Sequence, residues 1–353
     1  MAQPPPLPPE QPGISAPPST PPNDFGSGLR KRYVFLAGAA YGLLMRIAFG
    51  FPLLFNGARD NNASGAMLWS FLVLVPLLIG ALTVYFPGGR ERSLVYSLFA
   101  PWLPVTLFVI GSAVLLIEGS ICIAMAMPLF LLMAALGGLS MWLVLKLFRP
   151  SPVIMHSLLF LPLLAGVWER DITLPTDIRT SDASVVIAAK PESIWQLINH
   201  ATAIRSGEMS DGLAYRIGVP YPQEAITVTT DHGRVRKLRW QKGVHFDEPI
   251  NAWEEYRFIR WRYSFPPGSI PADALDEHVV IGGKYFDLVD TSYRLTPVAG
   301  GTRLDIHVTY RISTNFNWYA GIWGRVLVDD SAKTILAFYK HRAEDSSQAD
   351  HPG

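Results

Sequence analysis

Three long segments of the chain contain no Asp, Glu, Lys, Arg or His. They are Ala66–Phe86, Leu94–Ile117 and Ile121–Leu145, with 21, 24 and 25 residues. A helix rises about 1.5 Å per residue, so about 20 apolar residues are enough to cross the roughly 30 Å hydrocarbon core of a bilayer. The three segments therefore predict membrane spans, and they place the rest of the chain beside a bilayer.

Two further apolar segments extend the predicted transmembrane region to residues 29–169. Tyr33–Phe55 holds one charge, Arg46. A charge within a span is costly, so we expect Arg46 to pack between helices and to reach Glu118 or a backbone carbonyl. Val153–Trp168 has only 16 residues, which is short for a span. The region is therefore predicted to cross the membrane four or five times.

Basic residues fall on alternate connections between these segments. The positive-inside rule then places the N-terminus and the connections at 87–93 and 146–152 in the cytoplasm. If Val153–Trp168 crosses, there are five spans and the C-terminal part is extracytoplasmic, which is the orientation that we expect. If this segment lies only at the interface, the C-terminal part is cytoplasmic. The basic residues concerned are Arg30, Lys31, Arg32, Arg90, Arg92, Lys146 and Arg149.

The composition excludes several other classes of protein. A formal net charge of +1 at pH 7 gives no support for nucleic-acid binding. Cys122 is the only cysteine, so an intrachain disulfide and a cysteine-rich zinc site are both excluded. Residues 1–28 contain ten prolines and predict a disordered tail, passive or bound by a partner with a proline-binding groove. Residues 344–353 are predicted to form a second disordered tail.

Residues 183–343 have an ordinary soluble composition and follow a predicted linker at 170–182. Lys190–Ile198 predicts an amphipathic helix, and residues 317–342 carry apolar side chains at helical spacing. Between them, segments of alternating polarity predict strands at about 184–189, 226–230, 234–242, 256–265, 285–296 and 302–313. We therefore expect an α+β domain in which an antiparallel sheet wraps a long C-terminal helix and leaves a hydrophobic cavity between them.

The order of these elements, with the motif Ala188–Trp195, resembles the START-like (SRPBCC) helix-grip superfamily, which includes polyketide cyclase-like, Bet v 1-like and lipid-transfer proteins. The resemblance covers about residues 180–342. It implies a cavity for a lipid or other hydrophobic small molecule, without naming the ligand or a universal catalytic set. A closer likeness is to uncharacterised bacterial membrane-anchored proteins, which implies the bacterial inner membrane. It rests on Gly218–Pro222, Gly243–Ile250 with Trp253, Asp276–His278, Gly282–Phe286 and Asn315–Tyr319.

Large aromatic and polar residues of this domain are candidates for the pocket. His245 and Glu248 could fix the polar end of a ligand or act as acid and base. The alternative that we favour is a turn at Asp247–Pro249 with His245 at its edge. The loop Asp276–His278 could bind a metal, but an exposed acidic loop is favoured, and we expect no metal and no cofactor. The pocket candidates are Trp195, His245, Glu248, Trp253, Trp261, Tyr263, His278, Tyr285 and Trp323.

Basic residues between positions 234 and 262 outnumber acidic ones. On neighbouring strands, Arg236, Arg239 and Arg260 could form a positive face for lipid phosphates at the bilayer surface. A solvated strand pair with weak cross-strand ion pairs would give the same pattern.

These observations favour a membrane-anchored protein that binds, transfers or senses a lipid or other hydrophobic molecule. An alternative is a cyclase- or aromatase-like enzyme that uses His245, Glu248 or His278 on a hydrophobic substrate, and a second is a structural or regulatory membrane protein. The sequence lacks the G-x-S-x-G, H-E-x-x-H, P-loop and dinucleotide-binding motifs. The expected partners are the ligand and the bilayer, without nucleic acid; a protein partner is left open.

Overall fold

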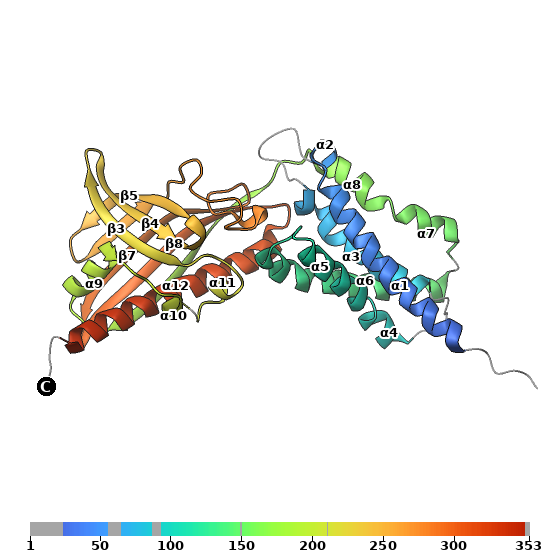
Figure 1. The fold of residues 1–353 in the computed structure, drawn as a ribbon, viewed down its shortest axis with the longest axis horizontal. Helices are drawn as coiled ribbons and strands as arrows, with labels where there is room; N and C mark the ends of the chain where they lie inside the picture. Colours follow the sequence, from blue (N-terminus) through green and yellow to red (C-terminus); the bar gives the residue numbers. More distant parts are fainter. Residues whose placement is uncertain (1–23, 56–64, 87–92, 149, 210, 350–353) are drawn as a thin grey trace, which may run out of the picture.

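A computed structural model describes residues 24–55, 65–86, 93–148, 150–209 and 211–349. The N-terminal helices form one region, and a sheet domain lies against one end of it (Figure 1). The predicted tail at 1–28 lies outside the described residues up to position 23, and α1 begins at Asp24. The elements of the helical region are α1 (Asp24–Phe49), α2 (Pro52–Phe55), η1 (Gly65–Met67), η2 (Ser70–Leu74), α3 (Val75–Tyr85), α4 (Leu94–Phe99), α5 (Trp102–Val114), α6 (Ser120–Leu147), α7 (Pro152–Leu158) and α8 (Leu161–Glu169).

Three helical stretches among the described residues are long and apolar enough to cross a membrane. They are Leu94–Val114, Ser120–Leu147 and Pro152–Glu169, whereas the apolar helices Tyr33–Phe49 and Ser70–Tyr85 are shorter. The fold therefore gives three clear candidates where the sequence predicted four or five spans. The segment that the sequence left open, around 153–168, belongs to one of the three.

Arg46 lies in the last turn of α1, not in the middle of a span as the apolar run to Phe55 suggested. The helix ends at Phe49 because Gly50 and Pro52 follow, and neither favours continuation of a helix. The expectation that Arg46 reaches Glu118 is confirmed, since Arg46 Nε donates a hydrogen bond to Glu118 Oε1.

The sheet domain consists of one eight-stranded antiparallel sheet in the order β1-β8-β7-β6-β5-β4-β3-β2. This curled sheet and the long helix α12 make the α+β fold that the sequence predicted, and α12 packs along β1 and β8 (Figure 1). The strands are β1 (Thr176–Ile187), β2 (His200–Ala201), β3 (Pro222–Thr230), β4 (Gly233–Trp240), β5 (His245–Glu254), β6 (Phe258–Arg262), β7 (Phe286–Val298) and β8 (Gly301–Ser313). The helices are α9 (Pro191–Asn199), α10 (Ser206–Met209), α11 (Leu213–Arg216), η3 (Gln241–Gly243), η4 (Glu277–Val279) and α12 (Asn317–Ala349).

The structure confirms the alternation of buried and more exposed residues that the sequence predicts for β8. Leu304, Ile306, Val308 and Tyr310 are all buried, with at most 6% of each residue exposed. Residues two apart on a strand share a face, so these four form one wall of the domain core.

Three boundaries differ from the expected ones. β1 begins at Thr176, inside the stretch read as a linker at 170–182, because residues 176–183 pair with β8 in spite of their polar composition. β5 runs straight through Asp247–Pro249, so the favoured turn at these residues is wrong. A proline is tolerated there because the β5–β6 register shifts directly after it, between Ile250 and Ala252. α12 continues to Ala349, into the stretch read as a tail.

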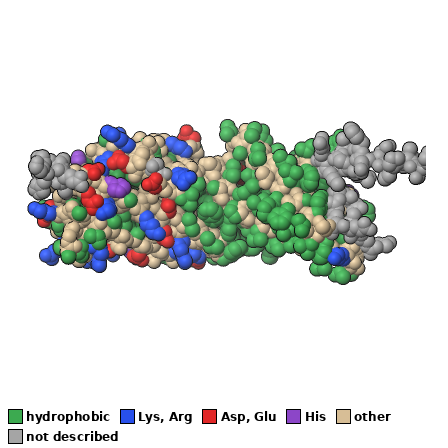
Figure 2. Space-filling model, turned by 90° about the horizontal axis from the view of Figure 1, so that it is seen from below, with side chains coloured by type: hydrophobic (Ala, Val, Ile, Leu, Met, Phe, Trp, Pro, Cys, Tyr) green, Lys and Arg blue, Asp and Glu red, His purple; other side chains and the backbone are tan. Residues whose placement is uncertain are grey.

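The surface divides along the same line as the fold. Figure 2 shows charged side chains gathered over the sheet domain and an almost uninterrupted hydrophobic surface over the helical region. Leu53, Leu116 and Trp168 are among the exposed apolar residues of that region, with 93%, 90% and 77% of each exposed. Apolar surface of this extent on a protein marks a binding or membrane-contact surface.

Candidate ligand cavity

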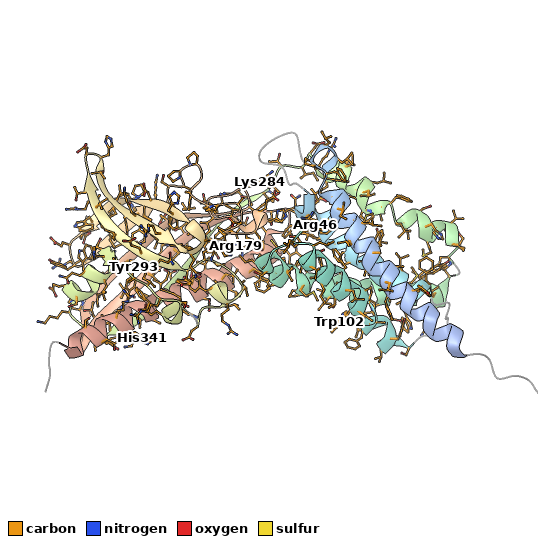
Figure 3. All side chains as sticks on the ribbon, in the orientation of Figure 1. Arg46, Trp102, Arg179, Lys284, Tyr293 and His341 are labelled. Carbon is orange, nitrogen blue, oxygen red and sulfur yellow. The ribbon has the colours of Figure 1, made fainter. Side chains whose placement is uncertain are left out.

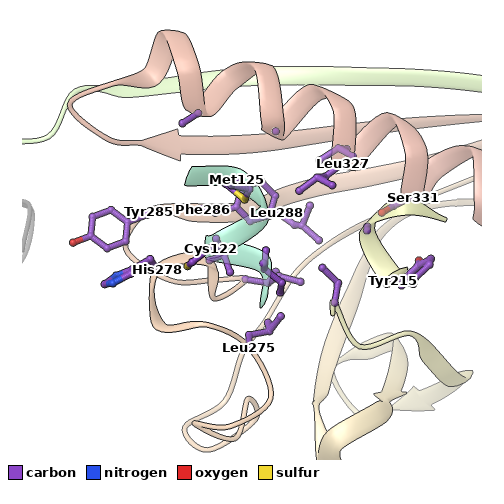
Figure 4. A pocket seen from close by; sticks show the side chains of 18 of the residues that line it. Cys122, Met125, Tyr215, Leu275, His278, Tyr285, Phe286, Leu288, Leu327 and Ser331 are labelled. Atoms are coloured by element: carbon purple, nitrogen blue, oxygen red, sulfur yellow. The ribbon is translucent and has the colours of Figure 1, made fainter. Parts of the chain in front are cut away.

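A cavity of about 310 Å³ passes from the interior of the sheet domain into the helical region. This volume lies at the lower end of the roughly 300–1,000 Å³ that is usual for small-molecule sites. Figure 4 shows the first turns of α6 at the cavity, with Cys122 and Met125 close to Phe286 and Leu288 of the sheet domain.

The wall on the side of the domain is built from the inward faces of the strands and one face of α12. Leu238 and Val308 point inward from the sheet, and small residues of α12, among them Gly324 and Ala332, leave space opposite them. Aromatic residues of the helical region, such as Phe108, continue the same cavity beyond the domain. The cavity is thus mainly apolar along its length and is shared by both parts of the protein.

A buried ion pair lies in the part of the cavity inside the sheet. Arg236 and Glu248 face each other on β4 and β5, and Arg236 Nη1 donates to Glu248 Oε2 at 2.5 Å. Arg236 also donates through Nε to the carbonyl of Ile198 at 3.0 Å and through Nη2 to Tyr339 Oη at 3.1 Å. Its guanidinium stacks 4.9 Å from the ring centroid of Trp261. The two residues are only 5% and 2% exposed, so both charges depend on these partners.

Burial sets the protonation of this group. It raises the pKa of the Glu248 carboxyl to about 7, although Arg236 opposes the shift. Burial also raises the pKa of the neighbouring hydroxyl groups of Tyr263, Tyr293 and Tyr339. Glu248 is therefore a group that can exchange a proton near neutral pH, and the phenols around it stay protonated.

A second polar group lies where the cavity crosses from one part of the protein to the other. We call Arg46, Glu118 and His278 the throat; all three line the cavity. The side chains of Arg46 and Glu118 are 11% and 17% exposed and form the ion pair described above. His278 Nδ1 is buried and has no hydrogen-bond partner among the described residues. Burial lowers the pKa of His278, with Glu118 acting in the opposite direction, so the imidazole is neutral at pH 7.

The loop that carries His278 docks on the helical region. Asp276 Oδ2 accepts a hydrogen bond from the backbone amide of Cys122, in the first turn of α6, at 2.7 Å. The expectation of an exposed acidic loop holds for Glu277, which is exposed, but not for Asp276, which is half-buried against α6. Among the described residues no group of three or more His, Cys, Asp or Glu side chains could hold a metal ion.

Three further contacts tie the two parts together around the cavity. Ser120 Oγ donates to the carbonyl of Ile217 at 2.7 Å, and Tyr319 Oη donates to the carbonyl of Met125 at 2.5 Å. Glu169, at the end of α8, is 6% exposed and accepts from the amide of Ser70 at 2.8 Å and from Asn315 Nδ2 at 3.2 Å. Its carboxylate thus joins the start of η2 to the loop before α12.

The predicted pocket residues fall into two groups. Glu248, Trp261, Tyr263, His278 and Tyr285 line the cavity, whereas Trp195, His245, Trp253 and Trp323 do not. Trp195 packs instead against Trp253, with ring centroids 4.8 Å apart, and exposed His245 interacts through Nδ1 with the carbonyl of Gly243 at 3.0 Å. Contact with a ligand stays a prediction for the residues of the first group.

The three arginines predicted as a positive face do not form one. Arg236 points into the cavity, because it shares its face of β4 with buried Leu238. Arg239 and Arg260 are exposed on β4 and β6, with β5 between them. Arg239 pairs with Glu224 at 3.1 Å, and Arg260 donates to Asn251 Oδ1 at 3.1 Å, as in a solvated strand surface. Figure 3 shows how side chains project outward around this domain and how Arg46, by contrast, lies at its junction with the helices.

The sequence analysis missed several lining residues. Tyr293 and Tyr339 were part of strand and helix patterns without a sign of their polar role. The throat was anticipated only as an ion pair of Arg46 and Glu118. Nothing in the sequence indicated that His278, far away in the chain, lines the same part of the cavity. One signal was available, since Arg46 and Glu118 are the only charges in their apolar surroundings.

Comparison with known proteins gives partial structural likenesses only. No protein-family model matches the chain, and no curated protein matches it. The Zhui aromatase/cyclase from Streptomyces sp. R1128 is 14% identical, with 49% of this chain and 98% of that chain covered and a TM-score of 0.30. Ara h 8.0201 is 13% identical, with 48% and 99% covered and a TM-score of 0.29. Protein Ms6760 from Mycobacterium smegmatis is 17% identical, with 50% and 100% covered and a TM-score of 0.26. No functional assignment follows from TM-scores of this size.

Proposed function

We propose that this protein is a membrane-anchored binding protein that holds a lipid or another hydrophobic small molecule and exchanges it with the bilayer. One observation carries the proposal: a mainly apolar cavity continues from the sheet domain into the helical region. A cavity confined to the sheet domain would serve a ligand taken from water. A cavity that also opens among apolar helices suits a ligand that is dissolved in the membrane.

Membrane anchorage is supported by two features of the helical region. Three helical stretches have the length and hydropathy of membrane spans. On the face that Figure 2 shows, the surface of these helices is mainly apolar, whereas charged residues gather over the sheet domain. A bilayer around the helices would bury this apolar surface. The bacterial inner membrane is the compartment that we propose.

An extracytoplasmic position of the sheet domain is supported by the course of the helices. α6 runs away from the domain to Lys146 and Leu147, and α7 and α8 return to it and end at Glu169 (Figure 1). Basic Lys146 therefore lies at the end of the helical region that is remote from the domain. Since basic residues favour the cytoplasmic side, the domain lies on the opposite side.

The test is to purify the full-length chain in detergent from its bacterial expression host and to analyse the bound molecules by native mass spectrometry and lipid extraction. We expect a hydrophobic molecule to co-purify with the protein. Ala332→Leu adds bulk where α12 lines the cavity, so it should reduce the bound amount several-fold. Ala337→Leu places the same side chain on the exposed face of α12 and should leave binding unchanged. A protein that retains no hydrophobic molecule from a broad panel contradicts the proposal.

An enzyme that uses acid–base chemistry on a hydrophobic substrate is a second candidate. One observation favours it, namely that Glu248 has a pKa of about 7 and lines the cavity beside protonated phenols. His245, another residue considered for this role, lies outside the cavity. Glu248→Gln should abolish turnover of any such substrate and leave its binding intact. If the parent and Glu248→Gln bind the molecule equally and neither converts it over time, the result argues against catalysis.

A further inference from the structure

We infer that the throat formed by Arg46, Glu118 and His278 is the site that holds the polar end of the ligand, and that it selects an uncharged hydroxyl group. The inference rests on the proposed function and adds the chemical class of the ligand.

Most polar groups inside the sheet already have partners within the protein. Arg236 is engaged by Glu248, Tyr339 and the carbonyl of Ile198. Tyr263 Oη and Thr291 Oγ1 are 2.7 Å apart and form a hydrogen bond. A ligand that bound at these groups would have to break existing bonds between buried polar atoms, which is costly.

Other cavity-lining side chains carry a buried polar atom with no hydrogen-bond partner among the described residues. These atoms are Ser112 Oγ, Trp240 Nε1, Trp261 Nε1 and His278 Nδ1. Only His278 belongs to the throat, where two full charges also face the cavity. A buried polar atom is usually satisfied by the protein, by water or by a ligand. His278 is therefore the place at which a polar ligand group gains most.

The position of His278 also suits this role. In Figure 4 its ring lies beside that of Tyr285, and both extend toward the end of the domain at which α12 begins. The two ring centroids are 6.1 Å apart. The side chain is thus directed to the junction with the helices, where Arg46 and Glu118 pair. A polar group bound there leaves the apolar walls on either side for the rest of the ligand.

The charge balance of the throat sets the chemistry of that polar group. Arg46 and Glu118 form an ion pair, and a neutral imidazole adds no charge. Asp276 and Glu277 act on His278 from outside the cavity lining and add negative charge, which disfavours an anionic ligand group further. A carboxylate, sulfate or ammonium group would bring an unpaired charge into a mainly apolar cavity, at a large desolvation cost. A hydroxyl group can donate and accept, so it fits either tautomer of His278. The site therefore favours an alcohol of hydrophobic character over a charged lipid of equal length.

Two probes with the same chain, 1-hexadecanol and hexadecyl sulfate, test this inference on the full-length protein in detergent. The two probes, in deuterated form, compete for the protein at equal concentration, and the amount of each that is retained is measured after extraction. Hexadecane, which has no polar group, reports on binding to the apolar cavity alone. The unmodified protein should prefer the alcohol. His278→Phe should weaken retention of the alcohol about tenfold, as expected for the loss of a buried hydrogen bond, and should leave hexadecane unaffected. The matched control is His245→Phe, at an exposed position outside the cavity.

Glu118→Gln gives a second readout that misfolding cannot imitate. It removes the ion-pair partner of Arg46, so the preference should shift toward hexadecyl sulfate. The inference is overturned if both probes are retained and neither His278→Phe nor Glu118→Gln changes the retained amounts. The proposed function would then still stand. Failure to retain all three probes, hexadecane included, contradicts the proposed function itself.

Discussion

Asp276 of the sheet domain caps the first turn of α6 by accepting a hydrogen bond from the backbone amide of Cys122 at 2.7 Å. The first amides of a helix lack partners within the helix, and the positive end of the helix dipole favours a carboxylate. A loop of one part of the protein thus completes a helix of the other. This contact lies beside the throat, since His278 follows Asp276 by two residues.

Asp276→Ala should destabilise the protein by about 0.5–2 kcal/mol, the usual cost of a lost helix cap. The measurement is thermal unfolding of the full-length protein in detergent. Asp273→Ala changes an exposed carboxylate of the same loop and should leave the melting temperature unchanged. Equal melting temperatures for both variants and the parent would show that the contact does not stabilise the fold.

Gly119→Ala should disrupt the same contact from the side of the helix. A Cβ atom at Gly119 would overlap with the carboxylate of Asp276, so the loop has to move away. We expect a lower melting temperature and weaker retention of a bound hydrophobic molecule. Gly111→Ala is the control in α5, because a Cβ atom there meets no atom within 4 Å. A Gly119→Ala protein as stable as its control would contradict the close approach of Asp276 to Gly119.

Removal of one partner of the buried pair Arg236–Glu248 should cost about 3–5 kcal/mol, because the other charge is left without compensation. We expect Glu248→Leu to lower the stability strongly, as measured by thermal unfolding. The double variant Arg236→Met, Glu248→Leu should recover much of the loss, since it leaves no buried charge. If the double variant is no more stable than Glu248→Leu, the ion pair is not the reason for the loss.

His278 should make the protein less stable as the pH falls. Its pKa in the folded protein is lowered by burial from the ordinary value of 6.5. The unfolded chain therefore binds a proton first, and the contribution to stability that is present above pH 6.5 is lost as the pH falls through the folded pKa. Arg46 opposes a charge on the ring, whereas Glu118, Glu277 and Asp276 favour one.

Glu248, whose pKa is raised to about 7, contributes stability in the opposite direction and is present in both proteins. The melting temperature of the parent should therefore fall relative to that of His278→Phe between pH 7.5 and pH 5.5. His245→Phe, at an exposed position, serves as the control and should keep the slope of the parent. An identical pH dependence in the parent and in His278→Phe would contradict the burial of a neutral imidazole.

We expect the C-terminus of the chain to lie outside the cytoplasm, which a reporter fused to it can test. The physical reason is the return of α7 and α8 from the basic end of the helical region to the sheet domain. We expect high activity for a fusion to alkaline phosphatase and no fluorescence for a fusion to a green fluorescent protein exported in unfolded form. The opposite pair of results would place the domain in the cytoplasm.

Local patterns in the sequence were enough to predict the two kinds of structure in this protein. Absence of charge over 21 to 25 residues indicated the apolar helices, and alternation such as that of Leu304 and Ile306 indicated the strands of the sheet. Both signals are local, because they depend on the 3.6-residue period of a helix and the two-residue period of a strand. The alternation of β4 also placed Arg236 on the face of Leu238, although the sequence analysis assigned Arg236 to the surface.

The polar groups of the cavity, in contrast, are brought together by the tertiary fold alone. Glu248 meets Arg236 through the register of β4 and β5, and the polar composition of residues 176–183 hid the start of β1 until its pairing with β8 was seen. His278 lines the same cavity as Arg46 and Glu118 because a loop of the sheet domain docks on α6. These pairs join distant parts of the chain. Strand register and the docking of the domain bring the charged groups together and bury them. No local periodicity of the sequence carries this information.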